Sequence, residues 1–109
     1  MSEPFFAIDR VPFQGPEGDQ PLGYRWYEPE RVVLGRPMRE QLRVAVCYWH
    51  SLCWPGTDMF GGETLARPWF AAGDPLALAA RKAAAAFELF GVLGVPFFTF
   101  HDRDVAPEL

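Results

Sequence analysis

The chain has 109 residues, of which half are apolar and 22% are charged, and its net charge at neutral pH is −4. This is the composition and length of one globular domain. The basic residues are scattered, which argues against a nucleic-acid-binding protein. No apolar run approaches the roughly 20 residues of a membrane span, which argues against a membrane protein. Two cysteines and an N-terminus without a secretory pattern favour a cytoplasmic protein.

The first 42 residues are rich in proline and glycine and are predicted to form an irregular N-terminal arm. Pro29 suits the first position of a short helix, because proline has no N–H to lose there. A second short helical piece is predicted after Pro37, through Leu42. The remaining residues, 43–109, form a second region of different character.

Two nearly continuous apolar runs in this region predict strands, at Arg43–His50 and Phe97–His101. Neither run alternates between polar and apolar residues, which is typical of parallel strands covered on both faces. A helix is predicted to follow Asp74 and Pro75, an N-cap and a first helical residue, and to end at about Leu93 before Gly94. The order strand, helix, strand predicts a right-handed βαβ unit. Because two strands and one helix cannot cover both faces of a sheet, we expect an incomplete domain.

The predicted helix carries two apolar stripes. The first is expected to pack on the sheet and comprises Leu76, Ala80, Ala83, Phe87 and Phe90. The second either meets another surface or is simply exposed, and comprises Leu78, Ala85, Leu89 and Val92.

A loop of about 23 residues, Ser51–Gly73, joins the first strand to the helix. Such long connections are usually functional or disordered, and its aromatic residues argue against disorder because their solvation would be costly. Trp49 and the loop residues Trp54, Phe60 and Trp69 either belong to the core or form a wall on which a sugar ring could stack.

The ends of the two strands carry the candidate chemistry, since working residues in parallel α/β folds follow the strands. Asp104 lies three residues after His101, so its carboxylate could accept a hydrogen bond from the imidazole and fix which ring nitrogen carries the proton. Such a histidine could exchange a proton with a substrate oxygen. Alternatively, the two acidic residues Asp102 and Asp104 only shape a turn. A metal site at His101 would have too few ligands.

A zinc site at Cys47, His50 and Cys53 is disfavoured for two reasons. Positions 47 and 50 would point to opposite faces of a strand, and a fourth ligand is missing. Two idle or buried thiols are the simpler interpretation.

Several blocks of the sequence resemble xylose isomerase. Residues 47–54 (CYWHSLCW), Asp58–Gly61 (DMFG) and Arg67–Trp69 resemble its first strand and following loop, and residues 95–108 (VPFFTFHDRDVAPE) resemble its second strand. The arm between positions 9 and 35 is similar to the longer N-terminal extension of one bacterial subgroup. The resemblance covers essentially the whole chain.

The resemblance implies a (β/α)₈ TIM barrel that works as a homotetramer and uses two divalent metals, Mg²⁺, Mn²⁺ or Co²⁺, to interconvert D-xylose and D-xylulose, and also glucose and fructose. It implies that His101 bonds the sugar ring oxygen and that Asp104 orients it. It further implies that Trp49 lines the sugar channel and that Phe60 is lent to a neighbouring subunit's active site.

A barrel of this kind needs roughly 250 residues, so the chain is expected to be the N-terminal βαβ portion of a partial barrel. The family's metal ligands and catalytic lysine would lie on later strands, and the chain alone is expected to be inactive. Two alternatives are a related sugar-handling barrel of the 3-epimerase type, and a non-catalytic remnant that acts only by association through its open sheet edges.

Overall fold

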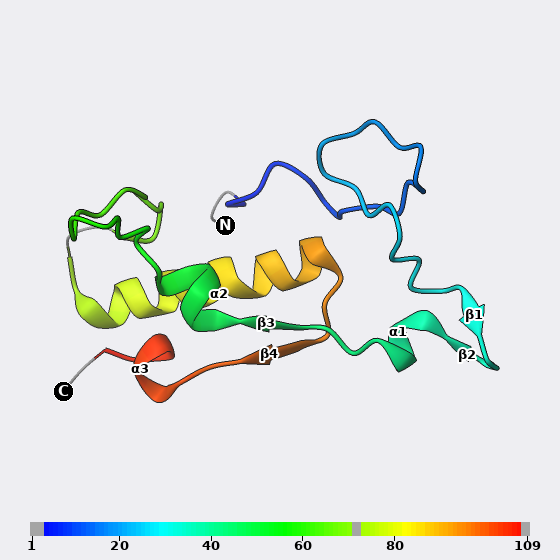
Figure 1. The fold of residues 1–109 in the computed structure, drawn as a ribbon. Helices are drawn as coiled ribbons and strands as arrows, with labels where there is room; N and C mark the ends of the chain where they lie inside the picture. The colour runs from blue at the N-terminus through cyan, green and yellow to red at the C-terminus, as the bar shows by residue number, and fades with distance from the viewer. Residues whose placement is uncertain (1–3, 71–72, 108–109) are drawn as a thin grey trace.

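The computed structural model describes residues 4–70 and 73–107 (Figure 1). Its elements, in chain order, are β1 (Val32–Val33), β2 (Arg36–Pro37), α1 (Met38–Gln41), β3 (Ala45–Cys47), a π-helical turn η1 (Trp49–Cys53), α2 (Pro75–Leu93), β4 (Phe97–Thr99) and α3 (Asp102–Val105). No helix among the described residues is long and apolar enough to cross a lipid bilayer.

Strands β3 and β4 form a parallel pair, with Ala45 opposite Phe97 and Cys47 opposite Thr99. The chain between them forms α2, which lies along the pair in Figure 1. The predicted strand–helix–strand order and parallel pairing are therefore confirmed, and the architecture is mixed α/β with two small sheets. Parallel pairing places the residues that follow β3 beside those that follow β4.

Both strands are shorter than the sequence predicts. Strand β3 ends at Cys47, and Tyr48 already has helical dihedral angles (φ −58°, ψ −43°) that lead into η1. Strand β4 ends at Thr99. All three residues of β4 are exposed, in agreement with the expectation that two strands and one helix cannot cover both faces of a sheet. Strand length follows the available pairing, and among the described residues each of these strands has one partner.

Helix α2 begins and ends as predicted. The side chain of Asp74 accepts a hydrogen bond from the backbone N–H of Ala77 at 3.1 Å, and Pro75 occupies the first turn. Gly94 ends the helix with a φ of +70°, a left-handed conformation that glycine adopts without strain. Local signals therefore set both ends of this helix.

The prediction for the first stripe of α2 is confirmed in part. The rings of Phe87 and Phe90 both contact Phe98 of β4, with centroids 5.6 and 5.0 Å apart, and Phe90 is buried. Leu76 and Ala80 of the same stripe are exposed. The second stripe is also covered, with Ala85 and Val92 buried.

The N-terminal arm provides part of this cover. The backbone N–H of Val11 donates to the carbonyl of Val92 at 2.7 Å, and the Tyr24 hydroxyl donates to the carbonyl of Leu93 at 2.6 Å. The N–H groups of Phe5 and Phe6 both donate to the carboxylate of Glu88, at 3.0 and 2.9 Å. Figure 1 shows the first part of the arm, before β1, on the side of α2 away from β3 and β4. The arm is thus fixed to the helix despite its irregular backbone.

The predicted helix after Pro29 is wrong, because this segment forms a hairpin of β1 and β2. Its turn residues, Leu34 and Gly35, both have positive φ angles, of 52° and 84°. Two such residues make the type of two-residue turn that matches the twist of a hairpin. The helical piece predicted after Pro37 is confirmed as α1.

The core lies between α2, β3, η1 and the end of the long loop. It comprises Val46, Tyr48, Leu52, Trp69, Ala85, Ala86 and Phe90. The indole Nε1–H of Trp69 donates to the carbonyl of Leu52 at 2.7 Å within this cluster. The loop is therefore tied to the core at its far end, as expected from its aromatic residues.

Candidate active site

The residues that follow β3 and β4 meet at one edge of the parallel pair. Trp49 begins η1 directly beyond Tyr48, while His101 precedes α3 and Asp104 lies within it. The two strands run in parallel, so the chain leaves both at this edge. Three of the four residues singled out from the sequence therefore come from neighbouring strand ends.

His101 and Asp104 form the pair that their spacing predicts. The Oδ2 of Asp104 lies 3.1 Å from His101 Nδ1 and also accepts the backbone N–H of His101 at 2.7 Å. The backbone N–H of Asp104 donates in return to the carbonyl of His101 at 3.0 Å. Three contacts across one turn of chain hold the two residues together.

The two side chains differ sharply in exposure. Asp104 is 1% exposed, whereas the imidazole of His101 is 74% exposed. An ionised carboxylate can only accept hydrogen bonds, so Nδ1 of His101 carries the proton whenever Asp104 is ionised. The other ring nitrogen, Nε2, is then the one left to meet a ligand. It can accept a proton when the ring is neutral and donate one when the ring is charged.

Trp49 stands beside this imidazole. The ring centroids of Trp49 and His101 are 6.4 Å apart, and the ring planes meet at 88°. Both residues line an open hollow of about 630 Å³, together with Asp102, Arg103 and Asp104. The hollow combines an aromatic wall with an exposed imidazole, two acids and a guanidinium, so it could hold a small polar ligand.

Phe60, the fourth singled-out residue, lies apart from the lining of this hollow. It sits on a tight turn in which the carboxylate of Asp58 accepts the N–H groups of Phe60 and Gly62, each at 2.9 Å. Its side chain is 88% exposed, beside an equally exposed Met59. The loop thus displays an aromatic side chain on an ordered turn.

A buried polar group that the sequence analysis did not single out lies behind the His101–Asp104 pair. Tyr48 is 2% exposed, and neither its hydroxyl nor Oδ1 of Asp104 has a hydrogen-bond partner among the described residues. Burial, with smaller effects of Cys53 and Asp104, raises the pKa of Tyr48 to about 12. The only sequence signal for this residue was a phenol at the end of an otherwise apolar run.

Cys53 belongs to the same neighbourhood. Its thiol lies 3.8 Å from the backbone carbonyl of Asp104 and 3.4 Å from the ammonium of Lys82, which donates to it. Burial raises the pKa of the Cys53 thiol, and the positive charge of Lys82 partly offsets that rise. Lys82 also lies 5.8 Å from the centre of the Tyr48 ring.

Within residues 4–70 and 73–107, no three His, Cys, Asp or Glu side chains come together as metal ligands would. Cys47 and His50 do not lie on one strand as the sequence predicts, because His50 lies in η1 and not on β3. The described part of the chain does not itself fit a metal ion.

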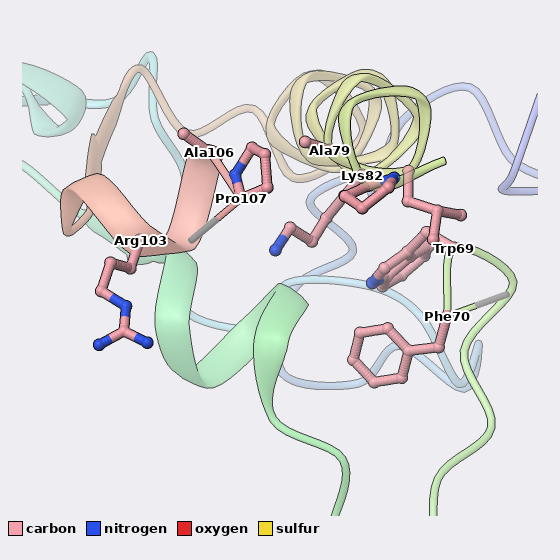
Figure 2. A pocket seen from close by; sticks show the side chains of 9 residues that line it. Trp69, Phe70, Ala79, Lys82, Arg103, Ala106 and Pro107 are labelled. Atoms are coloured by element: carbon pink, nitrogen blue, oxygen red, sulfur yellow. The ribbon is translucent and has the colours of Figure 1, made fainter. Parts of the chain in front are cut away.

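A second hollow, of about 410 Å³, lies between α2, α3 and the end of the long loop (Figure 2). Figure 2 shows Lys82 extending from α2 into it and Arg103 projecting away from it. Its lining comprises Trp69, Phe70, Pro75, Leu78, Ala79, Lys82, Arg103, Ala106 and Pro107. Since this lining holds no imidazole or carboxylate, the hollow at Trp49 and His101 is the better candidate for a reaction site.

Comparison with known proteins finds the same family that the sequence blocks resemble. The chain is 56% identical over 106 residues to a xylose isomerase of Pseudomonas syringae pv. syringae (strain B728a), a match that covers 96% of this chain. It is 55% identical over 109 residues to a xylose isomerase of Chelativorans sp. (strain BNC1), which covers 99% of this chain. It is 56% identical over 104 residues to a xylose isomerase of Burkholderia vietnamiensis (strain G4 / LMG 22486), which covers 95%.

In each of these comparisons the chain spans about a quarter (24%) of the relative's own length. No family model matches the chain. Identity above one half across nearly all of the chain nevertheless confirms the resemblance inferred from the sequence blocks: this chain is similar to xylose isomerases over almost its whole length.

Proposed function

We propose that the chain contributes the sugar-opening part of an aldose–ketose isomerase active site, in a protein that converts D-xylose to D-xylulose and also acts on glucose and fructose. The observation that carries this proposal is the pairing of the exposed imidazole of His101 with the buried carboxylate of Asp104, next to the indole of Trp49. The identity to xylose isomerases supports it.

The chemistry assigned to His101 is ring opening of the cyclic sugar. In this step one proton leaves the anomeric hydroxyl, the bond between the anomeric carbon and the ring oxygen breaks, and the ring oxygen gains one proton. With Nδ1 held by Asp104, Nε2 of His101 can serve as the proton-transfer group at the ring oxygen. Asp104 stabilises the positive charge that the ring carries when protonated.

The indole of Trp49 is proposed to pack against the C–H face of the sugar. Its side chain is half exposed and borders the same hollow as His101. Phe60 is proposed to complete the site of a neighbouring subunit in a homotetramer. Its support is the ordered turn on which this aromatic side chain is displayed to solvent.

The whole enzyme is proposed to use two divalent metals, Mg²⁺, Mn²⁺ or Co²⁺, as the resemblance implies, within a (β/α)₈ barrel of which β3, α2 and β4 form one unit. The described residues of this chain do not supply a cluster of metal ligands. We therefore assign no step through a metal to these residues, and we expect the 109-residue chain by itself to leave xylose unchanged. A cytoplasmic location is part of this proposal.

A chimeric enzyme tests the proposal. The 106 matching residues of the Pseudomonas syringae relative would be replaced by this chain, and D-xylulose formation from D-xylose would be followed with Mg²⁺ present. We expect activity in the chimera, and a loss of about 10²–10⁴-fold in kcat on His101→Gln, the range for losing a positioned proton-transfer group. His50→Gln is the matched control, because His50 is the other histidine of the chain and is absent from the lining of the hollow.

The alternative, a non-catalytic chain that only associates, makes the opposite prediction. It is favoured by the exposed aromatic residues of β4, which leave an uncovered sheet face. A chimera that assembles like its parent but lacks activity would support this alternative and overturn the proposed function. Turnover by the isolated chain would overturn the expectation that it is inactive alone.

A further inference from the structure

Two polar atoms behind the candidate site lack hydrogen-bond partners, although both side chains are buried. They are the hydroxyl of Tyr48, whose residue is 2% exposed, and Oδ1 of Asp104, whose residue is 1% exposed. Among the described residues these are the only buried side-chain oxygen or nitrogen atoms in this condition. Burying an oxygen without a partner is costly, so the presence of one donor and one acceptor in the same neighbourhood is informative.

The fold brings these two groups together. Tyr48 directly follows β3, and Asp104 lies in α3 just beyond β4, the parallel partner of β3. Cys53 and Lys82 connect them: the Cys53 thiol contacts the backbone carbonyl of Asp104 and the ammonium of Lys82, and this ammonium lies 5.8 Å from the centre of the Tyr48 ring. The Tyr48 hydroxyl can donate a hydrogen bond, whereas an ionised carboxylate can only accept one.

We propose that the Tyr48 hydroxyl is a further donor to the Asp104 carboxylate, at Oδ1 and through one bridging water, and that Tyr48 thereby positions the imidazole of His101. Oδ2 of Asp104 already holds the backbone N–H and Nδ1 of His101. A donor on Oδ1 fixes the rotation of the carboxylate, and with it the position of Oδ2 against His101. The catalytic consequence rests on the proposed function of His101, whereas the positioning itself does not.

The test uses the 109-residue chain and needs neither sugar nor metal. Long-range ¹H–¹⁵N NMR spectra of the labelled chain report which nitrogen of each imidazole carries the proton. The chain has two histidines, so His50 serves as an internal reference. We expect the ratio of the Nδ1-protonated to the Nε2-protonated form of His101 to fall about fivefold on Tyr48→Phe, as expected for the loss of one ordinary hydrogen bond. The signals of His50 should not change.

Tyr24→Phe is the matched control. It also removes a hydroxyl that donates a hydrogen bond, but its acceptor is the carbonyl of Leu93 at the end of α2. This variant should leave the His101 signals as they are in the unmodified chain. A folded Tyr48→Phe chain with unchanged His101 signals, or an equal change in Tyr24→Phe, would overturn the proposal.

A second measurement covers the case in which Tyr48→Phe does not fold. The phenol of Tyr48 would be titrated by ¹³C NMR in Asp104→Asn and in Asp102→Asn. The charged or titratable groups acting near this phenol are Cys53, Lys82 and Asp104. We expect the pKa of Tyr48 to fall from about 12 in the Asp104→Asn variant and to remain unchanged in the Asp102→Asn variant. An unchanged pKa in Asp104→Asn would contradict the proposed contact.

These outcomes are independent of the chimera's activity. A chimera without isomerase activity, together with the expected His101 signals, would remove the proposed function and leave the positioning contact in place. An active chimera, together with unchanged His101 signals in Tyr48→Phe, would support the proposed function and remove the positioning contact.

Discussion

The indole of Trp49 and the imidazole of His101 meet edge to face, with their centroids 6.4 Å apart. They belong to different strand ends, and only the parallel pairing of β3 with β4 brings them together. The contact places an aromatic wall beside an exposed imidazole. The proposed sugar site depends on this combination, because a sugar offers both C–H faces and hydroxyl groups.

Asp104→Ala should destabilise the chain more than Asp102→Ala. Asp104 is buried and accepts two hydrogen bonds from His101, so its replacement by alanine removes both bonds, at a cost of about 1–3 kcal/mol. Asp102 is exposed, and its replacement should cost roughly 0.5 kcal/mol or less. Urea unfolding followed by circular dichroism would measure both. Equal midpoints for the two variants would contradict the importance of the Asp104 contacts.

Trp69→Phe should lower the free energy of unfolding by about 1–3 kcal/mol, because the buried carbonyl of Leu52 loses its 2.7 Å donor. Trp26→Phe is the control, since Trp26 is 77% exposed. The measurement is the urea midpoint of each variant. If both tryptophan variants have the same urea midpoint as the unmodified chain, Trp69 does not anchor the long loop as described.

Glu88→Ala should release the N-terminal arm from α2. The carboxylate accepts the N–H groups of both Phe5 and Phe6, and no other acceptor for these groups is found among the described residues. Losing about 1 kcal/mol of local stability should speed hydrogen exchange of these two amides about fivefold. Glu63→Ala, at an exposed loop position, is the control. Unchanged exchange at Phe5 and Phe6 would show that the arm is held by other contacts.

The stability of the chain should fall between pH 10 and 12, and less steeply in Tyr48→Phe. Burial raises the pKa of Tyr48 from 10.0 to about 12, so the folded state holds this proton over a pH range in which the unfolded state has lost it. The folded state therefore binds more protons than the unfolded state, and the free energy of unfolding declines as the pH rises through this range. Urea unfolding at pH 9 and pH 11 would measure the difference. Parallel declines in both chains would mean that Tyr48 is not the titrating group.

The ends of α2 and the His101–Asp104 pair could be predicted from the sequence because both depend on residues a few positions apart. Asp74, Pro75 and Gly94 act within a single turn of the helix ends. The carboxylate of Asp104 likewise reaches His101 across one turn of chain. Interactions between residues so close in the sequence depend little on how the rest of the chain packs.

The lengths of the strands, the hairpin at Leu34 and Gly35, and the buried stripe of α2 could not be predicted in the same way. A strand ends where its pairing ends, and the hairpin depends on two left-handed residues of which one is a leucine. The stripe through Ala85 and Val92 is buried in part because the arm bonds to that part of α2. Hydrophobic periodicity alone could not show that this stripe is covered as well as the one whose Phe87 and Phe90 contact the sheet.

The sequence by itself determined the order strand, helix, strand, the ends of the helix, and the carboxylate that follows a histidine at the required spacing. Only the tertiary structure decided that Trp49 would contact this histidine, that Phe60 would be exposed to solvent, and that Tyr48 would be buried behind Asp104. Local features follow from neighbouring residues, whereas these three placements depend on how segments far apart in the chain pack against one another.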